Sequence, residues 1–320
     1  MDLRVRQWGA FVVLFALALR LWAWGLPETI FSILCQPNIA SFVIYLETGH
    51  HVRFSSSEAV RTWHSRESPP PRVQEDKGLI DPDVSVPVTN HTSLDPDLAS
   101  LLAQPLSWDL RSESPAVLIL HTHATESFAQ IGETYPESSH FRTLEEGYNM
   151  VSIGDRVASV LEAAGIRVLH DRTFHDYPSY NGSYLHARRS IEDYLREYPS
   201  IRLVLDLHRD ASSGETQLRP LVSGSDCAQL MLVVGTNASG QGHPNWEENL
   251  ALALKLHCLL EQDTPGIMRP LDLRSQRFNQ DLSPGALLIE VGAAGNTRQE
   301  ALTAAEALAR AILKLAEGSQ

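Results

Sequence analysis

The stretch from Val117 to Phe128, VLILHTHATESF, joins a short apolar run to a cluster of polar residues. Aliphatic side chains come first, and His121, His123 and Glu126 follow at once. In an open α/β sheet, functional sites form beyond the carboxyl ends of the strands. The stretch therefore predicts a buried strand that delivers titratable side chains to a site.

The chain that follows this strand alternates between apolar runs and amphipathic stretches. Continuous apolar runs are typical of buried, mostly parallel strands, and their alternation with helices predicts an α/β fold. We expect a mostly parallel central sheet with helices on both faces. The predicted strands are 117–121, 166–171, 201–210, 227–235 and 285–292, and the predicted helices are 148–165, 183–199, 245–262 and 296–318.

The N-terminal part of the chain has a different character. Arg4 and Arg6 precede an apolar run at 8–26 that is long enough to cross a bilayer, which predicts a retained signal-anchor rather than a cleaved signal peptide. The C-terminal domain would then lie outside the cytoplasm, on a single-pass protein of the cell membrane. The predicted segments are an anchor at 1–26, a juxtamembrane segment at 27–52, an extended Pro- and Ser-rich linker at 53–113 and a folded domain at 114–320 that carries the candidate site described below.

Composition narrows the function classes. A formal net charge of −13 argues against a nucleic-acid-binding protein, which needs a basic face. The three cysteines form no CxxC or zinc-ribbon pattern, so any metal site would use His and carboxylate ligands. Neither a dinucleotide-binding motif nor a P-loop occurs, and Ser127 lacks the glycines of a nucleophile elbow.

Three predicted strands end in polar residues of the kind that bind zinc. His123 and Glu126 form an H-x-x-E pair, and His208 near the end of the strand at 201–210 supplies a third ligand. Three such ligands with an open fourth position are typical of a catalytic zinc site. Glu290 would be the outer carboxylate that takes a proton from the attacking water and passes it to the leaving amine. His121 competes with His123 for the ligand position.

Other residues are candidates for secondary roles. Arg209 or His121 could stabilise an oxyanion. The loop HDRTFHDYPSYNGSY could hold substrate, although it also has the composition of a solvated turn region. Its candidate substrate-binding residues are His175, Asp176, Tyr180 and Asn181.

Several long motifs occur together in one order: HTHATESF, DYPSYNGSY, LDLHRDA, VVGTN and RFNQDLSPGALLIEVGAAGNT. Together they resemble the stage II sporulation protein P family from Val117 to the C-terminus. The resemblance implies a zinc-dependent N-acetylmuramoyl-L-alanine amidase of an endospore-forming bacterium, with a single zinc ion, the fold of zinc amidases and an additional crosslink endopeptidase activity. It implies peptidoglycan as substrate and stage II sporulation proteins D and M as partners during engulfment.

The resemblance also implies roles for individual residues. His208 matches the third zinc ligand of the wider group of zinc amidases, and Glu290 matches the catalytic glutamate. Many of those enzymes take a carboxylate ligand from the start of the following helix, where this chain has Asn149. For this reason Glu126 is the expected carboxylate ligand.

Two alternative functions stay open. A zinc carboxypeptidase would need an arginine for a free carboxylate, and Arg269, Arg274 or Arg277 could serve. An inactive wall-binding module would bind no zinc and leave peptidoglycan unchanged.

Overall fold

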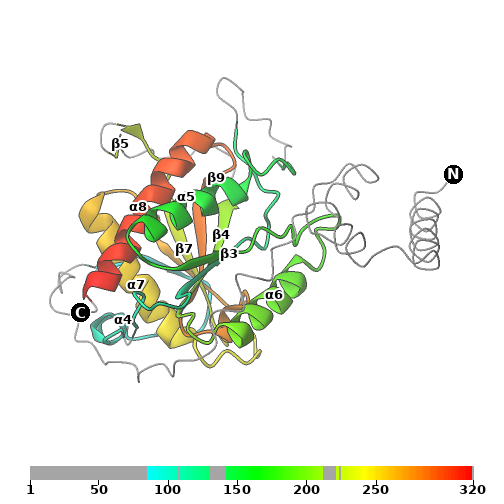
Figure 1. Ribbon diagram of the computed structural model, residues 1–320. Helices are drawn as coiled ribbons and strands as arrows, with labels where there is room; N and C mark the ends of the chain where they lie inside the picture. Colours follow the sequence, from blue (N-terminus) through cyan, green and yellow to red (C-terminus); the bar gives the residue numbers. More distant parts are fainter. Residues whose placement is uncertain (1–84, 107, 130–141, 212–220, 223–224, 319–320) are drawn as a thin grey trace, which may run out of the picture. The chain divides into compact units, whose positions relative to one another are not determined.

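The computed structural model describes residues 85–106, 108–129, 142–211, 221–222 and 225–318 (Figure 1). The predicted anchor at 1–26, the juxtamembrane segment at 27–52 and the linker up to residue 84 lie outside these ranges. Within the described ranges, no helix is both long enough and apolar enough to cross a membrane.

A seven-stranded sheet with the order β1-β8-β7-β9-β4-β2-β3 forms the centre of the fold. Within this sheet β7 and β9 pair antiparallel, and every other pair of neighbours is parallel. A separate hairpin joins β5 and β6. The strands are β1 (Val88–Asn90), β2 (Val117–Leu120), β3 (Val168–His170), β4 (Leu203–Asp210), β5 (Leu221–Val222), β6 (Ser225–Asp226), β7 (Leu230–Gly235), β8 (Leu271–Arg274) and β9 (Ala286–Ala293).

Helices lie on both faces of the sheet, but unevenly (Figure 1). The larger apolar core packs α5, α7 and α8 against one face, whereas a smaller cluster packs α6 against the other face under β2 and β4. The predicted α/β architecture is confirmed at this level. The helices are α4 (Leu98–Ala103), α5 (Met150–Ala163), α6 (Ser183–Glu197), α7 (Trp246–Asp263) and α8 (Arg298–Gly318), with a 3-10 turn, η2 (Gln280–Leu282).

Local sequence explains the ends of α5. Asn149 is the N-cap, and its side-chain oxygen accepts a hydrogen bond from Val151 N. Gly165 follows the helix with φ +86°, a conformation that favours glycine at helix C-termini. Val151, Gly154 and Leu161 are buried, as the helical periodicity of the sequence predicts.

The described part of the predicted linker differs from the expectation. Residues 88–90 form the edge strand β1, which pairs parallel with β8. The short helix α4 packs on α7, and the buried Lys255 of α7 donates a hydrogen bond to Leu102 O. The folded unit therefore begins before residue 114, because this Pro-rich segment still carries enough apolar side chains to add a strand and a helix.

Strand β8, which has four residues with alternating burial, is a further element that the sequence pattern did not predict. So short a run is ambiguous from periodicity alone. Its partner β7 runs antiparallel to β9, so the residues that follow β7 lie at the opposite edge from those that follow β4 and β9. Cys227 and Cys258 are buried free thiols, and Cys35 lies outside the described residues.

Candidate active site

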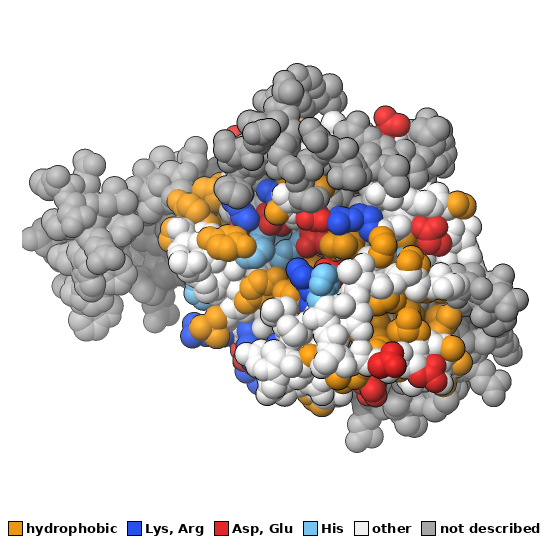
Figure 2. Space-filling view, turned by 180° about the vertical axis from the view of Figure 1, so that it is seen from behind, with side chains coloured by type: hydrophobic (Ala, Val, Ile, Leu, Met, Phe, Trp, Pro, Cys, Tyr) orange, Lys and Arg blue, Asp and Glu red, His pale blue; other side chains and the backbone are white. Residues whose placement is uncertain are grey.

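The sheet brings the predicted strand ends together. Strands β2, β4 and β9 are parallel neighbours, and His208 on β4 lies directly opposite Glu290 on β9. His123 and Glu126 follow the carboxyl end of β2. Figure 2 shows histidine side chains gathered with acidic and basic side chains near the middle of one face. The predicted convergence of these strand ends is present in the structure.

His123, Glu126 and His208 form the centre of this cluster, and all three are buried. The rings of His123 and His208 meet edge to face, with centroids 5.2 Å apart. Nδ1 of His208 lies 3.8 Å from Oε2 of Glu126. Burial raises the pKa of the Glu126 carboxyl, although His208 and Arg209 oppose this shift.

Asp206, which the sequence analysis did not single out, supports His208 from behind. Its Oδ1 lies 3.0 Å from His208 Nε2. Both of its oxygens accept hydrogen bonds from Thr122, at 2.8 Å from the backbone N and 2.6 Å from Oγ1. Burial disfavours both charges, yet their attraction lowers the pKa of Asp206 to about 2 and raises that of His208 to about 10.

Arg142 is a second residue that the sequence analysis missed. Its Nη2 donates to Glu126 Oε1 at 3.3 Å, and its Nη1 donates to Asp176 Oδ2 at 2.7 Å. The guanidinium also lies 4.9 Å from the ring centroid of Tyr180. Arg142 therefore orients Glu126 and ties the loop after β3 to the site. A lone arginine in a polar loop gives no sequence signal for this role.

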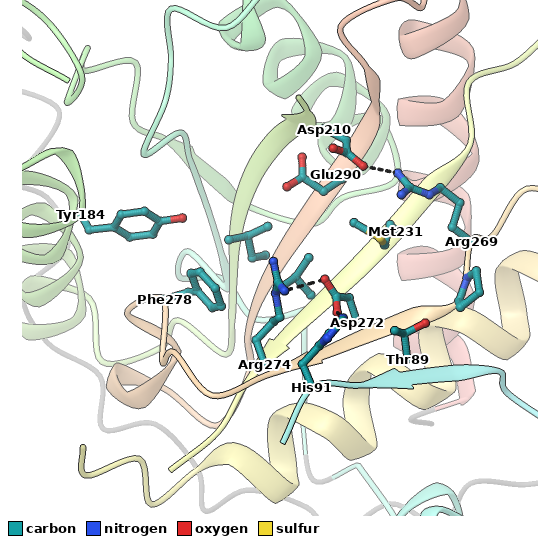
Figure 3. Close-up of a pocket in the computed structure, with 13 residues that line it drawn as sticks. Thr89, His91, Tyr184, Asp210, Met231, Arg269, Asp272, Arg274, Phe278 and Glu290 are labelled. Carbon is teal, nitrogen blue, oxygen red and sulfur yellow. Dashed lines mark hydrogen bonds and ion pairs between the residues drawn. The ribbon is translucent and has the colours of Figure 1, made fainter. Parts of the chain in front are cut away.

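Glu290 lines a cavity of ≈ 420 Å³ that opens beside the cluster (Figure 3). Burial raises the pKa of its carboxyl to about 8, and the nearby charge of Glu126 adds to the shift. A carboxyl with a pKa near neutrality can both accept and release protons at working pH. This is the property that acid–base catalysis needs.

Tyr184, at the start of α6, was also missed. Its ring packs against His123 and His208, with centroids 5.5 Å and 6.3 Å away. Figure 3 shows its hydroxyl pointing into the cavity that Glu290 lines. Burial raises the pKa of this hydroxyl, so it stays a neutral hydrogen-bond donor.

The cluster offers imidazole and carboxylate groups, which are common zinc ligands, and some of its buried polar atoms lack a hydrogen-bond partner. Near the cluster, Nδ1 of His123 and Oε2 of Glu290 are buried without a hydrogen-bond partner, whereas Nε2 of His208 faces Asp206 Oδ1 at 3.0 Å. The 3.8 Å between His208 Nδ1 and Glu126 Oε2 is close to the roughly 3.3 Å that separates two ligand atoms of a tetrahedral zinc ion. Across the described ranges, however, the side chains as they stand form no group of three or more such residues that could hold a metal ion.

His121, which competes with His123 for the predicted ligand position, does not join this cluster. The chain turns after Leu120, and His121 Nδ1 lies 3.1 Å from Leu207 O while its Nε2 lies 2.9 Å from His170 Nε2. Since both ring nitrogens have partners within the fold, the position of His121 does not support a catalytic role.

Arg209 lies behind Glu126 rather than in the cavity. Its backbone N donates to Glu126 Oε2 at 3.2 Å, and its Nε donates to Ser127 O at 3.1 Å. The alternation along β4 sends its side chain to the face opposite that of His208. Its contacts indicate that it positions Glu126, whereas the sequence analysis proposed an oxyanion role.

The four predicted substrate-binding residues divide into two groups. His175 and Asp176 are buried and bonded within the protein, to Asp171 and to Thr125 with Arg142, respectively. Tyr180 is exposed and stacks on His123 at 4.5 Å between centroids. Asn181 is exposed at the end of the same loop. Tyr180 is thus the member of this set that lies beside the cluster.

The sequence matches a known protein family. The family model for stage II sporulation protein P matches residues 50–313. Stage II sporulation protein P of Bacillus subtilis (strain 168) is 30% identical over 212 residues, which cover 62% of this chain and 50% of that protein. The chain thus matches about half the length of this relative.

Solved structures of similar shape include two amidases. The N-acetylmuramoyl-L-alanine amidase AmiC2 of Nostoc punctiforme is 17% identical with a TM-score of 0.41, and the match covers 63% of this chain and 97% of that one. The N-acetylmuramyl-L-alanine amidase Ami1 from Mycobacterium smegmatis is 16% identical with a TM-score of 0.40, over 66% of this chain and 100% of that one.

Proposed function

Since the chain belongs to the stage II sporulation protein P family, we propose that it is a zinc-dependent peptidoglycan amidase that acts during sporulation. It would hydrolyse the amide between N-acetylmuramic acid and L-alanine. The observation that carries this proposal is the meeting of His123, Glu126 and His208 with Glu290 beside one cavity.

His123, Glu126 and His208 would hold the zinc ion, and Asp206 and Arg142 would orient two of these ligands. When bound, zinc would polarise the scissile carbonyl and make water a nucleophile at neutral pH. The unpartnered Nδ1 of His123 supports this assignment, because buried polar atoms without partners are rare.

Two residues that line the cavity would also take part in the reaction. Glu290 would accept the proton of the attacking water and deliver it to the nitrogen of the leaving L-alanine. The Tyr184 hydroxyl would donate a hydrogen bond to the oxygen that becomes negative in the tetrahedral intermediate. Both groups line the same cavity, from opposite sides (Figure 3).

Cellular context follows from the same premise. The apolar run at 8–26 would anchor the protein in the cell membrane, with the catalytic domain on the extracytoplasmic side. The fold would be that of the zinc amidases. Stage II sporulation proteins D and M would be partners, and crosslink endopeptidase activity would be a second reaction of the same site.

The test uses the full chain in detergent with purified peptidoglycan, and the products are identified by mass spectrometry. Release of free stem peptides that begin with L-alanine, lost with a chelator and restored by zinc, is the expected result. Metal content measured by elemental analysis should drop in His123→Ala and His208→Ala but stay near one zinc per chain in Glu290→Gln. Full activity in His208→Ala would contradict the proposed site.

A zinc carboxypeptidase is the second candidate. Arg269 and Arg274 line the same cavity as Glu290, whereas Arg277 is not among its lining residues. An arginine in the wall of this cavity could hold the free carboxylate of a peptide substrate. Shortened stem peptides that are still attached to muramic acid would identify this reaction. Unchanged peptidoglycan, together with a protein that contains no zinc, would identify an inactive binding module.

A further inference from the structure

The cavity extends well beyond the residues that the proposed reaction needs. It runs from Glu290 on β9 across β7 and β8 to β1, on the face of the sheet where α6 packs against β2 and β4. Among the described helices, α6 packs only under the other half of this face. The half that no described helix covers presents side chains of β7, β8 and β1 and of the residue after β1: Met231, Val233, Asp272, Arg274, Thr89 and His91.

Arg274 is the residue of this surface that could bind an anionic group of a ligand. Its Nε lies 3.3 Å from Asp272 Oδ2, and its side chain is 43% exposed. Figure 3 shows the guanidinium directed into the cavity. Nε is buried without a well-formed hydrogen bond. A guanidinium held in this way presents a planar fork that matches a carboxylate in two hydrogen bonds.

A second arginine of the cavity, Arg269, is already engaged in a close ion pair. Arg269 also lines the cavity, but its Nη1 forms a close ion pair with Asp210. That pair is beside Glu290 in Figure 3, whereas Arg274 lies toward β1. Arg274 is therefore the better candidate for an anion that is distant from the reacting bond.

The sheet register sets the distance between Arg274 and Glu290. The Arg274 guanidinium is level with Asp272, which lies two strands from β9 and two residues along from Glu290 in register. With about 4.8 Å between strands and 3.3 Å per residue, the separation is roughly 12 Å. An extended peptide covers this distance in about three to four residues, at about 3.5 Å per residue.

We propose that this half of the cavity binds the peptide part of the substrate, and that Arg274 receives a peptide carboxylate about three residues from the bond that is cut. This inference rests on the proposed amidase function, because it places the scissile bond at Glu290. It deepens that function by assigning to Arg274 the recognition of one carboxylate of the peptide.

The test measures binding without catalysis. A tripeptide with the chemistry of a stem, L-alanyl-γ-D-glutamyl-diaminopimelate, is titrated calorimetrically into the full chain, and so is its fully amidated counterpart. Wild type should bind the acid form about tenfold or more tightly than the amide, because a charge-assisted bidentate bond is lost. Arg274→Gln should bind both forms equally, and Arg274→Lys should keep only part of the preference.

Arg156→Gln is the matched control. Arg156 lies on α5 and pairs at 3.4 Å with Glu306 of α8, helices that pack on the opposite face of the sheet. This variant should bind like wild type, and the thermal midpoints of all variants show that each is folded. Equal binding of acid and amide by wild type, or a preference kept by Arg274→Gln, would overturn the inference.

The same protein samples separate this inference from the amidase proposal. Muramoyl-tripeptide is incubated with wild type, and release of the tripeptide is followed by mass spectrometry. Binding that depends on Arg274 without release would sustain the peptide site and remove the amidase. Release with no dependence of binding on Arg274 would sustain the amidase and remove the peptide site.

Discussion

At the scale of single residues, the site depends on side chains that hold the proposed ligands in place. Arg142 contacts Glu126, Asp176 and Thr125. The Asp176 side chain is completely buried, so it needs the positive charge and the donors that surround it. The free-energy cost of leaving a buried carboxylate without its partner is larger than the stabilisation from an exposed ion pair.

We therefore expect Arg142→Gln to lower the free energy of unfolding by about 2–3 kcal/mol. Arg196→Gln is the control, because Arg196 and its partner Asp193 are both largely exposed, and it should change stability by less than about 0.5 kcal/mol. Urea unfolding measures both. An equal effect of the two substitutions would show that the Asp176 charge does not depend on Arg142.

Tyr184 gives a prediction about rate. Tyr184→Phe keeps the ring that packs against His123 and His208 but removes the hydroxyl. If that hydroxyl stabilises the oxyanion, kcat should fall by about 100-fold with little change in KM. Zinc content and thermal midpoint should match those of wild type. A variant with an unchanged kcat would remove Tyr184 from the reaction.

His243 gives a prediction about pH. It is buried, neither ring nitrogen has a hydrogen-bond partner, and burial lowers its pKa to about 4. The unfolded chain has a value of about 6.5 and binds the proton first. The free energy of unfolding should therefore fall as pH drops from about 6.5 to 4, by up to about 1.4 kcal/mol per pH unit, and this effect should be absent above about 6.5.

Urea unfolding of wild type and His243→Gln across this pH range measures the effect. The variant should lose stability more slowly than wild type as pH falls, because one buried imidazole no longer resists protonation. Parallel curves for the two proteins would show that His243 takes up its proton in the folded state without penalty.

At the scale of elements, the packing of α5 on the sheet depends on the absence of a side chain. Gly154 lies against the imidazoles of His170 and His121, and a Cβ built there would be 2.4 Å from His170 Nε2. His170 Nδ1 in turn lies 3.1 Å from Oδ1 of Asp155, the residue that follows Gly154. The glycine permits this polar contact between helix and strands.

Gly154→Ala should accordingly destabilise the protein by about 1–3 kcal/mol, even though alanine favours a helix by about 1 kcal/mol over glycine. Gly147→Ala is the control, since nothing lies within 4 Å of the Cβ built there, and it should have little effect. Thermal unfolding distinguishes the two. A stabilised Gly154→Ala variant would mean that the histidines move aside at little cost.

Element prediction from the sequence succeeded where periodicity was long. The helices α5, α6, α7 and α8 begin and end within a few residues of the expected positions, because amphipathic stretches of this length give a clear signal. β1 and β8 were missed because three or four residues carry little pattern. Their pairing with each other and with β7 makes them strands.

At the scale of the whole molecule, the N-terminal segment of the described chain completes the fold. Leu101 of α4 is buried in the main core, and Lys255 of α7 bonds to the carbonyl of Leu102. β1 supplies an edge strand of the sheet, and Thr89 of β1 and the following residue, His91, form part of the cavity wall.

A fragment that begins at Ser85 should therefore have a higher thermal midpoint than one that begins at Ser114, because the shorter fragment exposes the apolar surface under α4. Loss of the Leu101 side chain alone is worth about 2–5 kcal/mol, and Leu101→Ala in the longer fragment tests that share. Calorimetry measures all three. Equal midpoints for the two fragments would show that β1 and α4 add nothing to the core.

The sequence alone determined the α/β class and the group of residues from which the site is built. Apolar runs that end in His123, Glu126, His208 and Glu290 indicate where polar side chains leave the sheet, because parallel strands deliver their carboxyl ends to one edge. Those four positions also carry the family motifs.

Only the tertiary structure decided which other polar residues hold the side chains of these four positions in place. Asp206 and Arg142 reach the site through contacts 84 and 16 positions away in sequence, with Thr122 and Glu126 respectively. His121 contacts Leu207 O and His170 instead of joining His123 in the cluster. Such contacts depend on strand register and on the direction of each side chain, which local sequence patterns do not specify.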